Sequence, residues 1–193
     1  MKNCSAERIP GVEYRCPGHK LYPPKPQQIL EAEELIAKQR SSPFQRLSLA
    51  IHEAGHKRIF DECQIRTTYI GPSIIHRKET DEYVLGYGAT VCNWDEWSSL
   101  TDRQRARIAV AGAVSESVLL KNNSPKNSEM DFLEYIQSGF APALDLVLIW
   151  KQTEEEFRRE LKSDLRLQQT IVHEAERFQQ RIFGIDRRLS ERS

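Results

Sequence analysis

The chain has 193 residues, and its 28 lysine and arginine side chains balance 28 aspartate and glutamate side chains, so the formal charge is zero. This length accommodates one domain with a substantial core, and the charge balance argues against nucleic acid as a partner. No apolar run approaches the roughly 18 residues that a membrane span needs, and the N-terminus lacks the apolar segment of a signal peptide. We therefore expect a cytoplasmic protein without a membrane span.

The N-terminal part of the chain predicts an appendage to the domain. Five prolines within the first 26 residues and little periodicity predict an extended arm, followed by a short charged helix at 27–40. Ser42 and Pro43 are then a helix start signal, with Ser42 as the N-cap and proline at the first helical position. We predict an arm with a short helix at 1–42 and a single domain at 43–193.

The segments from 44 to 91 predict one helix and a small sheet. Apolar residues and the histidines at 52 and 56 share a stripe with helical spacing over 44–61. Three segments that resemble short strands follow, separated by a Gly-Pro turn at 71–72 and a charged turn at 79–82. These strands are expected at 64–70, 73–78 and 83–91.

The C-terminal half predicts helices. Thr101 and Gln104 form a capping-box pattern ahead of an apolar, buried central helix that carries Glu116 inside. Ser128 is the expected N-cap of the next helix, which Gly139 terminates. The remainder, about 142–183, is expected to be helical, and its charged part at 153–183 predicts one or two exposed amphipathic helices. The expected fold class is α+β, mainly α-helical, with a helical core and a small sheet.

The stretch HEAGH at 52–56 suggests a metal site. On a helix, His52 and His56 share one face, so both imidazoles can converge on one zinc ion, while Glu53 points at the water that it deprotonates. Chance alone produces this pattern in roughly one shuffled chain in a hundred, so two histidines that merely share a helix face are the competing interpretation. The mid-helix Gly55 indicates close approach by another group.

A zinc peptidase needs a third protein ligand and an open position for water. The candidates in this chain are Asp131, Glu116, His76 and His19. We favour Asp131, because it is expected in the first turn of a helix, where the helix dipole stabilises a carboxylate. Glu116 lies deeper in an apolar helix and is expected to accept a hydrogen bond from a ligand histidine, although a buried glutamate bonded elsewhere is an equally good interpretation.

Four motifs in order resemble the protease domain of FtsH-type ATP-dependent zinc metalloproteases. HEAGH at 52–56 matches the zinc motif of that family, and VLGY at 84–87 is similar to its ALGY strand. The segment 99–120 resembles its helix of small residues, and 127–136 its following helix with an aspartate. The resemblance covers about 43–140 and implies an HExxH zincin-like core.

The resemblance also implies roles for individual residues. His52, His56 and Asp131 would bind Zn²⁺, and Glu53 would be the catalytic base. By the same comparison, a strand edge would hold the substrate by backbone pairing. The residues of that edge are Val84, Leu85, Gly86 and Tyr87.

The chain departs from the family in its expected lack of membrane spans and of an ATPase domain. No glycine is followed by lysine, so the phosphate-binding motif of an ATPase is missing from the sequence. We therefore expect a stand-alone homologue that acts without its own ATP hydrolysis, with a separate ATPase or adaptor partner unidentified.

Four functions compete at this point. The leading hypothesis is a zinc metallopeptidase that hydrolyses peptides or unfolded proteins, with Glu53 as general base. A catalytically silent zinc-binding regulatory module of the same fold is the main alternative. A purely structural helical protein would bind no zinc. A different HExxH peptidase family, such as those that cut phage-type repressors, would place the third ligand elsewhere than Asp131.

Overall fold

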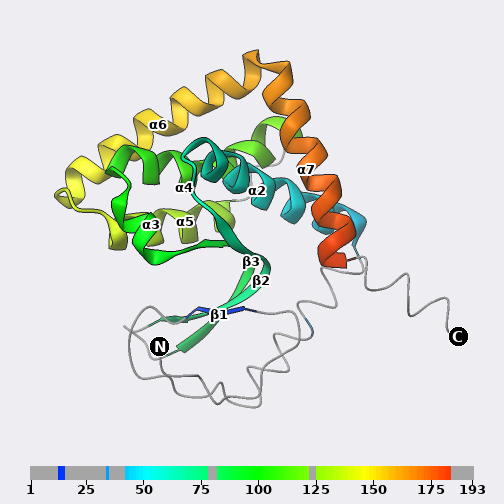
Figure 1. The fold of residues 1–193 in the computed structure, drawn as a ribbon, viewed down its shortest axis with the longest axis horizontal. Helices are drawn as coiled ribbons and strands as arrows, with labels where there is room; N and C mark the ends of the chain where they lie inside the picture. The colour runs from blue at the N-terminus through cyan, green and yellow to red at the C-terminus, as the bar shows by residue number, and fades with distance from the viewer. Residues whose placement is uncertain (1–12, 16–33, 35–41, 78–81, 122–124, 184–193) are drawn as a thin grey trace, which may run out of the picture.

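The computed structural model describes residues 13–15, 34, 42–77, 82–121 and 125–183. Within them the protein is mainly helical with one small sheet, as predicted (Figure 1). The elements in chain order are β1 (Glu13–Arg15), α2 (Pro43–Glu62), β2 (Thr67–Arg77), β3 (Glu82–Cys92), α3 (Trp94–Ser99), α4 (Asp102–Leu119), α5 (Pro125–Ser138), α6 (Ala143–Ser163) and α7 (Leu165–Phe183).

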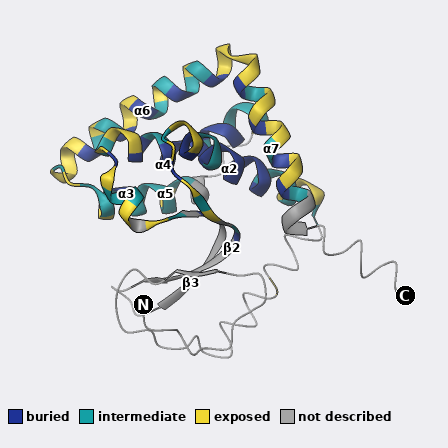
Figure 2. Ribbon diagram, in the orientation of Figure 1, coloured by how far each residue is buried: buried dark blue, intermediate teal, exposed yellow. Residues whose placement is uncertain are grey.

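Helix α4 is the centre of the helical part. The predicted capping box is present, with the side chain of Thr101 accepting from the Gln104 amide and the Gln104 side chain accepting from the Thr101 amide. Because α4 is apolar on nearly every side, it packs against α2, α5 and α6 at once. Figure 2 shows buried residues concentrated in α2 and α4, and the prediction of a buried central helix is confirmed.

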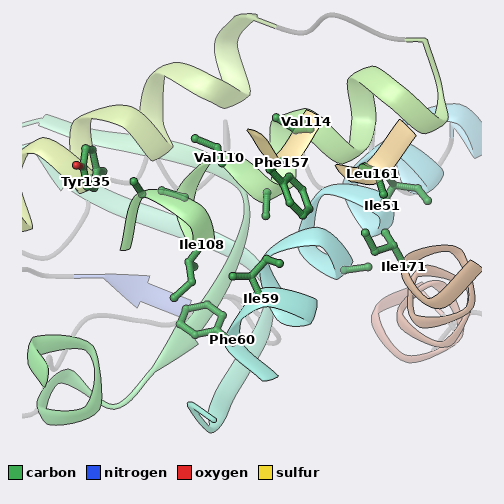
Figure 3. Close-up of a cluster of buried hydrophobic side chains, with 14 of the residues drawn as sticks. Ile51, Ile59, Phe60, Ile108, Val110, Val114, Tyr135, Phe157, Leu161 and Ile171 are labelled. Atoms are coloured by element: carbon green, nitrogen blue, oxygen red, sulfur yellow. The ribbon is translucent and has the colours of Figure 1, made fainter. Parts of the chain in front are cut away.

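The hydrophobic core joins α2, α4, α6 and α7 (Figure 3). Helices α6 and α7 are amphipathic as expected, but their inner faces are buried rather than exposed. The reason is their apolar spacing of three, four or seven residues, which aligns one stripe of α6 against α4 and one stripe of α7 against α2. The buried stripes are Leu146, Trp150, Phe157 and Leu161 in α6, and Leu167, Ile171, Ala175 and Phe178 in α7.

The sheet has the strand order β1-β2-β3, with β1 parallel and β3 antiparallel to β2. The prediction of a Gly-Pro turn is wrong, because β2 runs straight through Gly71 and Pro72. The ladder is irregular at this point: Gly71 pairs with Ala89, but Ser73 pairs with Gly86, so the partner strand bulges. Such a bulge accommodates a proline, which has no amide hydrogen for the ladder.

The ends of two other helices test the predicted start signals. The side chain of Ser42 accepts a hydrogen bond from the amide of Gln45, and Pro43 is the first residue of α2, as predicted. Ser128, however, is not the N-cap of α5, which already begins at Pro125. Proline is favoured at the first helical position, and this preference determines where α5 starts.

Several predictions concern residues outside the described part of the chain. The extended arm and the helix at 27–40 lie there, apart from Glu34 and the strand β1, and so does most of the charged turn at 79–82. The predicted domain boundary between 42 and 43 stays a prediction. None of the helices in the described segments has the length and apolar character needed to cross a membrane.

Candidate metal centre

His52 and His56 of α2 face the interior of the protein. They are 6% and 7% exposed, and their Nε2 atoms lie 2.9 Å apart. The rings are nearly perpendicular, with an interplanar angle of 75°. Positions i and i+4 of a helix lie one turn apart on the same face, which brings both nitrogens to one point.

The other nitrogen of each ring is already committed to an acceptor. His56 Nδ1 donates to the carbonyl oxygen of Ile108 at 2.7 Å, and His52 Nδ1 lies 2.6 Å from Glu116 Oε1. A carbonyl or carboxylate oxygen selects the tautomer that carries its hydrogen on Nδ1. In the neutral rings, both Nε2 lone pairs therefore point into the shared space, as in histidines that bind a metal.

Asp131 of α5 completes this group. Its Oδ2 lies 3.3 Å from His52 Nε2 and 3.6 Å from His56 Nε2, and this oxygen is buried without a hydrogen-bond partner. The expectation that Asp131 stands in the first turn of its helix is wrong, because α5 begins at Pro125 and Asp131 falls in the second turn. The carboxylate is stabilised by the two histidines rather than by the helix end.

The three groups shift one another's pKa in a consistent direction. Burial lowers the pKa of His52 and His56, but nearby carboxylates, chiefly Asp131, outweigh burial and leave both pKa values raised, that of His52 strongly. Burial raises the pKa of Asp131, but the two histidines outweigh it and hold that pKa well below its usual range. The site therefore favours a positive charge among these groups, either a proton or a metal ion.

The spacing of the three atoms fits a metal ion. His52 Nε2, His56 Nε2 and an oxygen of Asp131 all lie within 4.8 Å of one another. Ligands of a tetrahedral ion bound at about 2.0–2.1 Å are about 3.3–3.5 Å apart, close to the observed 2.9, 3.3 and 3.6 Å. Asp131 Oδ2 is buried and has no hydrogen-bond partner, so a cation bound among the three atoms would also satisfy this oxygen. This cluster could hold a metal ion.

Two glycines make room for the cluster where α2 crosses α4. A Cβ on Gly112 would lie 2.4 Å from His56 Nε2 and 2.6 Å from His52 Nε2. A Cβ on Gly55 would lie 2.5 Å from the backbone oxygen of Ala111, which confirms the close approach predicted for Gly55. The crossing thus depends on Gly55, whereas the space between the histidine rings depends on Gly112.

This difference gives a paired prediction. We expect Gly112→Ala to keep the fold and to weaken zinc binding by at least about 10-fold. The new methyl group would displace the two imidazole rings from the orientation that their Nδ1 hydrogen bonds hold. Gly55→Ala should instead lower the free energy of unfolding by about 1–3 kcal/mol, since its methyl group meets backbone. Zinc titration and urea unfolding of both variants measure the two effects. Wild-type zinc affinity in Gly112→Ala would contradict a zinc site between the histidine rings.

Glu116 and Ser48 form a chain behind His52. Glu116 is 1% exposed, its Oε1 meets His52, and its Oε2 accepts a hydrogen bond from the Ser48 hydroxyl at 2.5 Å. The structure thus puts Glu116 in the contact that was expected from its position in a buried helix. A doubly held carboxylate fixes both the orientation and the tautomer of the His52 ring.

Glu53 lies next to the cluster and is 2% exposed. Its Oε2 accepts a hydrogen bond from the Thr90 hydroxyl of β3 at 2.6 Å. A buried carboxylate needs such a donor, because burying an ionised group without hydrogen-bond partners costs several kcal/mol or more. The side chain is therefore held by a specific partner between α2 and the sheet.

The remaining predicted site residues are distributed as follows. The segment 84–87 forms part of β3, where Val84, Leu85 and Gly86 pair with β2, but its side chains lie outside the described part of the chain. The same holds for the side chain of His76, and for His19 entirely. The sequence HEA recurs at 173–175, but the His173 side chain there is 73% exposed on α7 and lies outside the metal cluster.

Sequence reasoning missed several parts of the site. Gly112 could have been recognised by the argument applied to Gly55, as a glycine inside an apolar helix. Thr90, Ser48 and the carbonyl of Ile108 had no signal, because each acts through a contact with a residue that is distant in sequence.

A scan against protein-family models and searches of curated proteins and of solved structures find no significant match to this chain.

Proposed function

We propose that this protein is a zinc-dependent peptidase that hydrolyses peptides or unfolded proteins. The observation that carries the proposal is the convergence of two histidine nitrogens and the unsatisfied Oδ2 of Asp131 on one point. Two imidazoles and one carboxylate form a ligand set of catalytic zinc sites, which keep a position open for water or substrate. Glu53, adjacent in sequence to a ligand, supplies the base that hydrolysis needs.

The residues of the chain divide the chemistry among them. His52, His56 and Asp131 would hold the ion, which when bound supplies a Lewis acid for the peptide carbonyl and lowers the pKa of water to about 7. Glu53 would take a proton from the attacking water and pass it to the leaving amine. Glu116 and the Ile108 carbonyl keep the ligand rings aligned through Nδ1.

Strand β3 offers a surface for the substrate. It pairs with β2 along one side, and among the described residues no strand pairs with its other side. An extended peptide can add to such an edge through backbone hydrogen bonds, whatever its side chains. We propose that the segment 84–87 binds substrate in this way, which suits a peptidase that accepts unfolded chains.

We also propose that the fold is that of the FtsH-type protease domain. The support is the order of the four motifs and their location: HEAGH in α2, VLGY in β3, the helix of small residues as α4, and Asp131 in α5. Both α2 and α5 pack on α4, and residues of these three helices meet around His52, His56 and Asp131, which supports the proposal for three of the four motifs.

Metal removal tests the proposal. We expect a chelator to abolish cleavage of unfolded casein and one equivalent of Zn²⁺ per chain to restore it. Zinc at about 100 times its Kd should also stabilise the fold by about 2.7 kcal/mol. Iron(II) and manganese(II) loaded in parallel identify the metal that supports cleavage.

The alternatives give different results in the same experiment. Tight binding of one zinc per chain without cleavage of casein or short peptides would contradict the peptidase and support a silent zinc-binding module. No zinc binding and unchanged stability on chelation would contradict both.

A further inference from the structure

Strand β3 makes a direct polar contact with the proposed base. The hydroxyl of Thr90 lies 2.6 Å from Glu53 Oε2 and 3.3 Å from the backbone oxygen of Glu53. Both residues are buried, with exposures of 8% and 2%. A hydroxyl has one hydrogen, so the shorter contact, to the carboxylate, is the one that it makes.

Thr90 is a rigid donor. Its backbone is paired with Ile70 in the β2–β3 ladder, which fixes the position of its Cα. Its side chain is β-branched and has few accessible rotamers, so the hydroxyl direction is restricted as well. A hydrogen bond from such a group orients its acceptor instead of following it.

Glu53 needs an orienting partner because its side chain is long. Several torsions separate its carboxylate from α2, and a general base acts only when it lies within hydrogen-bond reach of the proton that it abstracts. A bond from Thr90 to Oε2 restricts the rotation of the carboxylate, so that Oε1 would be the oxygen that takes the proton. Small errors in such a position cost large factors in rate.

We propose that Thr90 is the positioning residue for Glu53, holding Oε2 so that Oε1 faces the water beside the metal ligands. The inference rests on the proposed peptidase function. It gives β3 two roles, because the segment 84–87 would pair with substrate and Thr90 lies three residues further along the same strand. The irregularity of the ladder opposite Pro72 lies between the paired residues Gly86 and Ala89. One strand would then align both the substrate backbone and the base.

Three variants of the full chain test this role, each loaded with one zinc. Thr90→Val removes the hydroxyl and keeps the shape, Thr90→Ser keeps the hydroxyl, and Thr153→Val makes the same chemical change at a buried threonine of α6. We expect Thr90→Val to lower kcat by about 10- to 100-fold, with KM and zinc affinity within about twofold of wild type. Thr90→Ser and Thr153→Val should keep wild-type kcat.

A binding measurement gives a readout independent of turnover. A peptide hydroxamate chelates zinc and places its hydroxyl proton against a neighbouring carboxylate base. Calorimetry should show about 10-fold weaker hydroxamate binding to Thr90→Val than to wild type, and unchanged binding to Thr90→Ser. If Thr90→Val unfolds, Thr90→Ala removes the same hydroxyl with a smaller side chain and is measured in its place.

The outcomes separate this inference from the function on which it rests. Wild-type kcat and hydroxamate affinity in the hydroxyl-free variant overturn the role of Thr90 and leave the peptidase standing. Equal losses in Thr90→Ser and Thr90→Val also overturn it, since the methyl group rather than the hydroxyl would then matter. Zinc-loaded wild type that cleaves nothing overturns the peptidase and this role together.

Discussion

We expect Glu53→Gln to retain one zinc per chain and to lower kcat/KM for an unfolded substrate by about 10²- to 10⁴-fold. Glutamine has the shape of glutamate, and its amide oxygen can still accept the Thr90 hydrogen bond that now binds Oε2. The packing of this buried site therefore survives the change. What is lost is the ability to take a proton from water, because an amide is not a base near neutral pH.

The chain contains a matched control for this variant. The sequence HEA recurs at 173–175, where Glu174 pairs with Arg177 on α7 and is not one of the three residues of the metal cluster. Glu174→Gln should leave both zinc content and cleavage unchanged. Full cleavage by Glu53→Gln would show that another group serves as the base, whereas loss of zinc from this variant would make Glu53 part of the ion's binding site.

The fold was predictable where local chemistry decides the structure. The starts of α2 and α4 follow from N-cap side chains that accept a hydrogen bond from the backbone amide three residues further on, and both are confirmed. The start of α5 and the path of β2 through Pro72 were predicted wrongly. At α5 one local signal, Pro125, prevailed over another, Ser128. In β2 the pairing with β3 overrode the local Gly-Pro turn signal.

The site was predictable as far as residue type and spacing allow. The four-residue spacing of the histidines implies one helix face, and the apolar surroundings of Glu116 imply a buried partner. The outer contacts could not be predicted, because Thr90 reaches Glu53 across 37 positions of sequence and Ser48 reaches Glu116 across 68. Such contacts depend on how α2 packs against β3 and α4, which no local pattern encodes.

The second large effect is expected at the third ligand. Loss of a residue that hydrogen-bonds a metal ligand typically weakens metal binding by about 10- to 100-fold. Asp131→Asn removes a ligand itself, so we expect a larger loss of zinc affinity, and cleavage should fall with zinc occupancy. The amide keeps the shape of the carboxylate but lacks the charge that balances the ion. Equilibrium dialysis against zinc, followed by cleavage assays at saturating zinc, separates lost binding from lost turnover.

A charge change on the same helix is the control. Glu129 is exposed on α5 and also carries a negative charge. Glu129→Gln should leave zinc affinity within about twofold of wild type, because exposed charges interact weakly with a site that they do not contact. An Asp131→Asn protein that keeps both zinc and cleavage would place the third ligand elsewhere and favour a different HExxH peptidase family.

In the metal-free protein, the interaction of Asp131 with His52 and His56 should make the free energy of unfolding depend on pH. The raised pKa values of His52 and His56 stabilise the fold below the ordinary histidine pKa of about 6.5, and this contribution disappears as the pH rises through the raised values. The lowered pKa of Asp131 contributes above about pH 4 and is lost as the pH falls through the lowered value. Metal-free Asp131→Asn should therefore be less stable than wild type mainly between about pH 4 and 6.5. Urea unfolding at several pH values measures this difference, and a deficit that is constant from acidic to alkaline pH would assign the effect to packing instead of to charge.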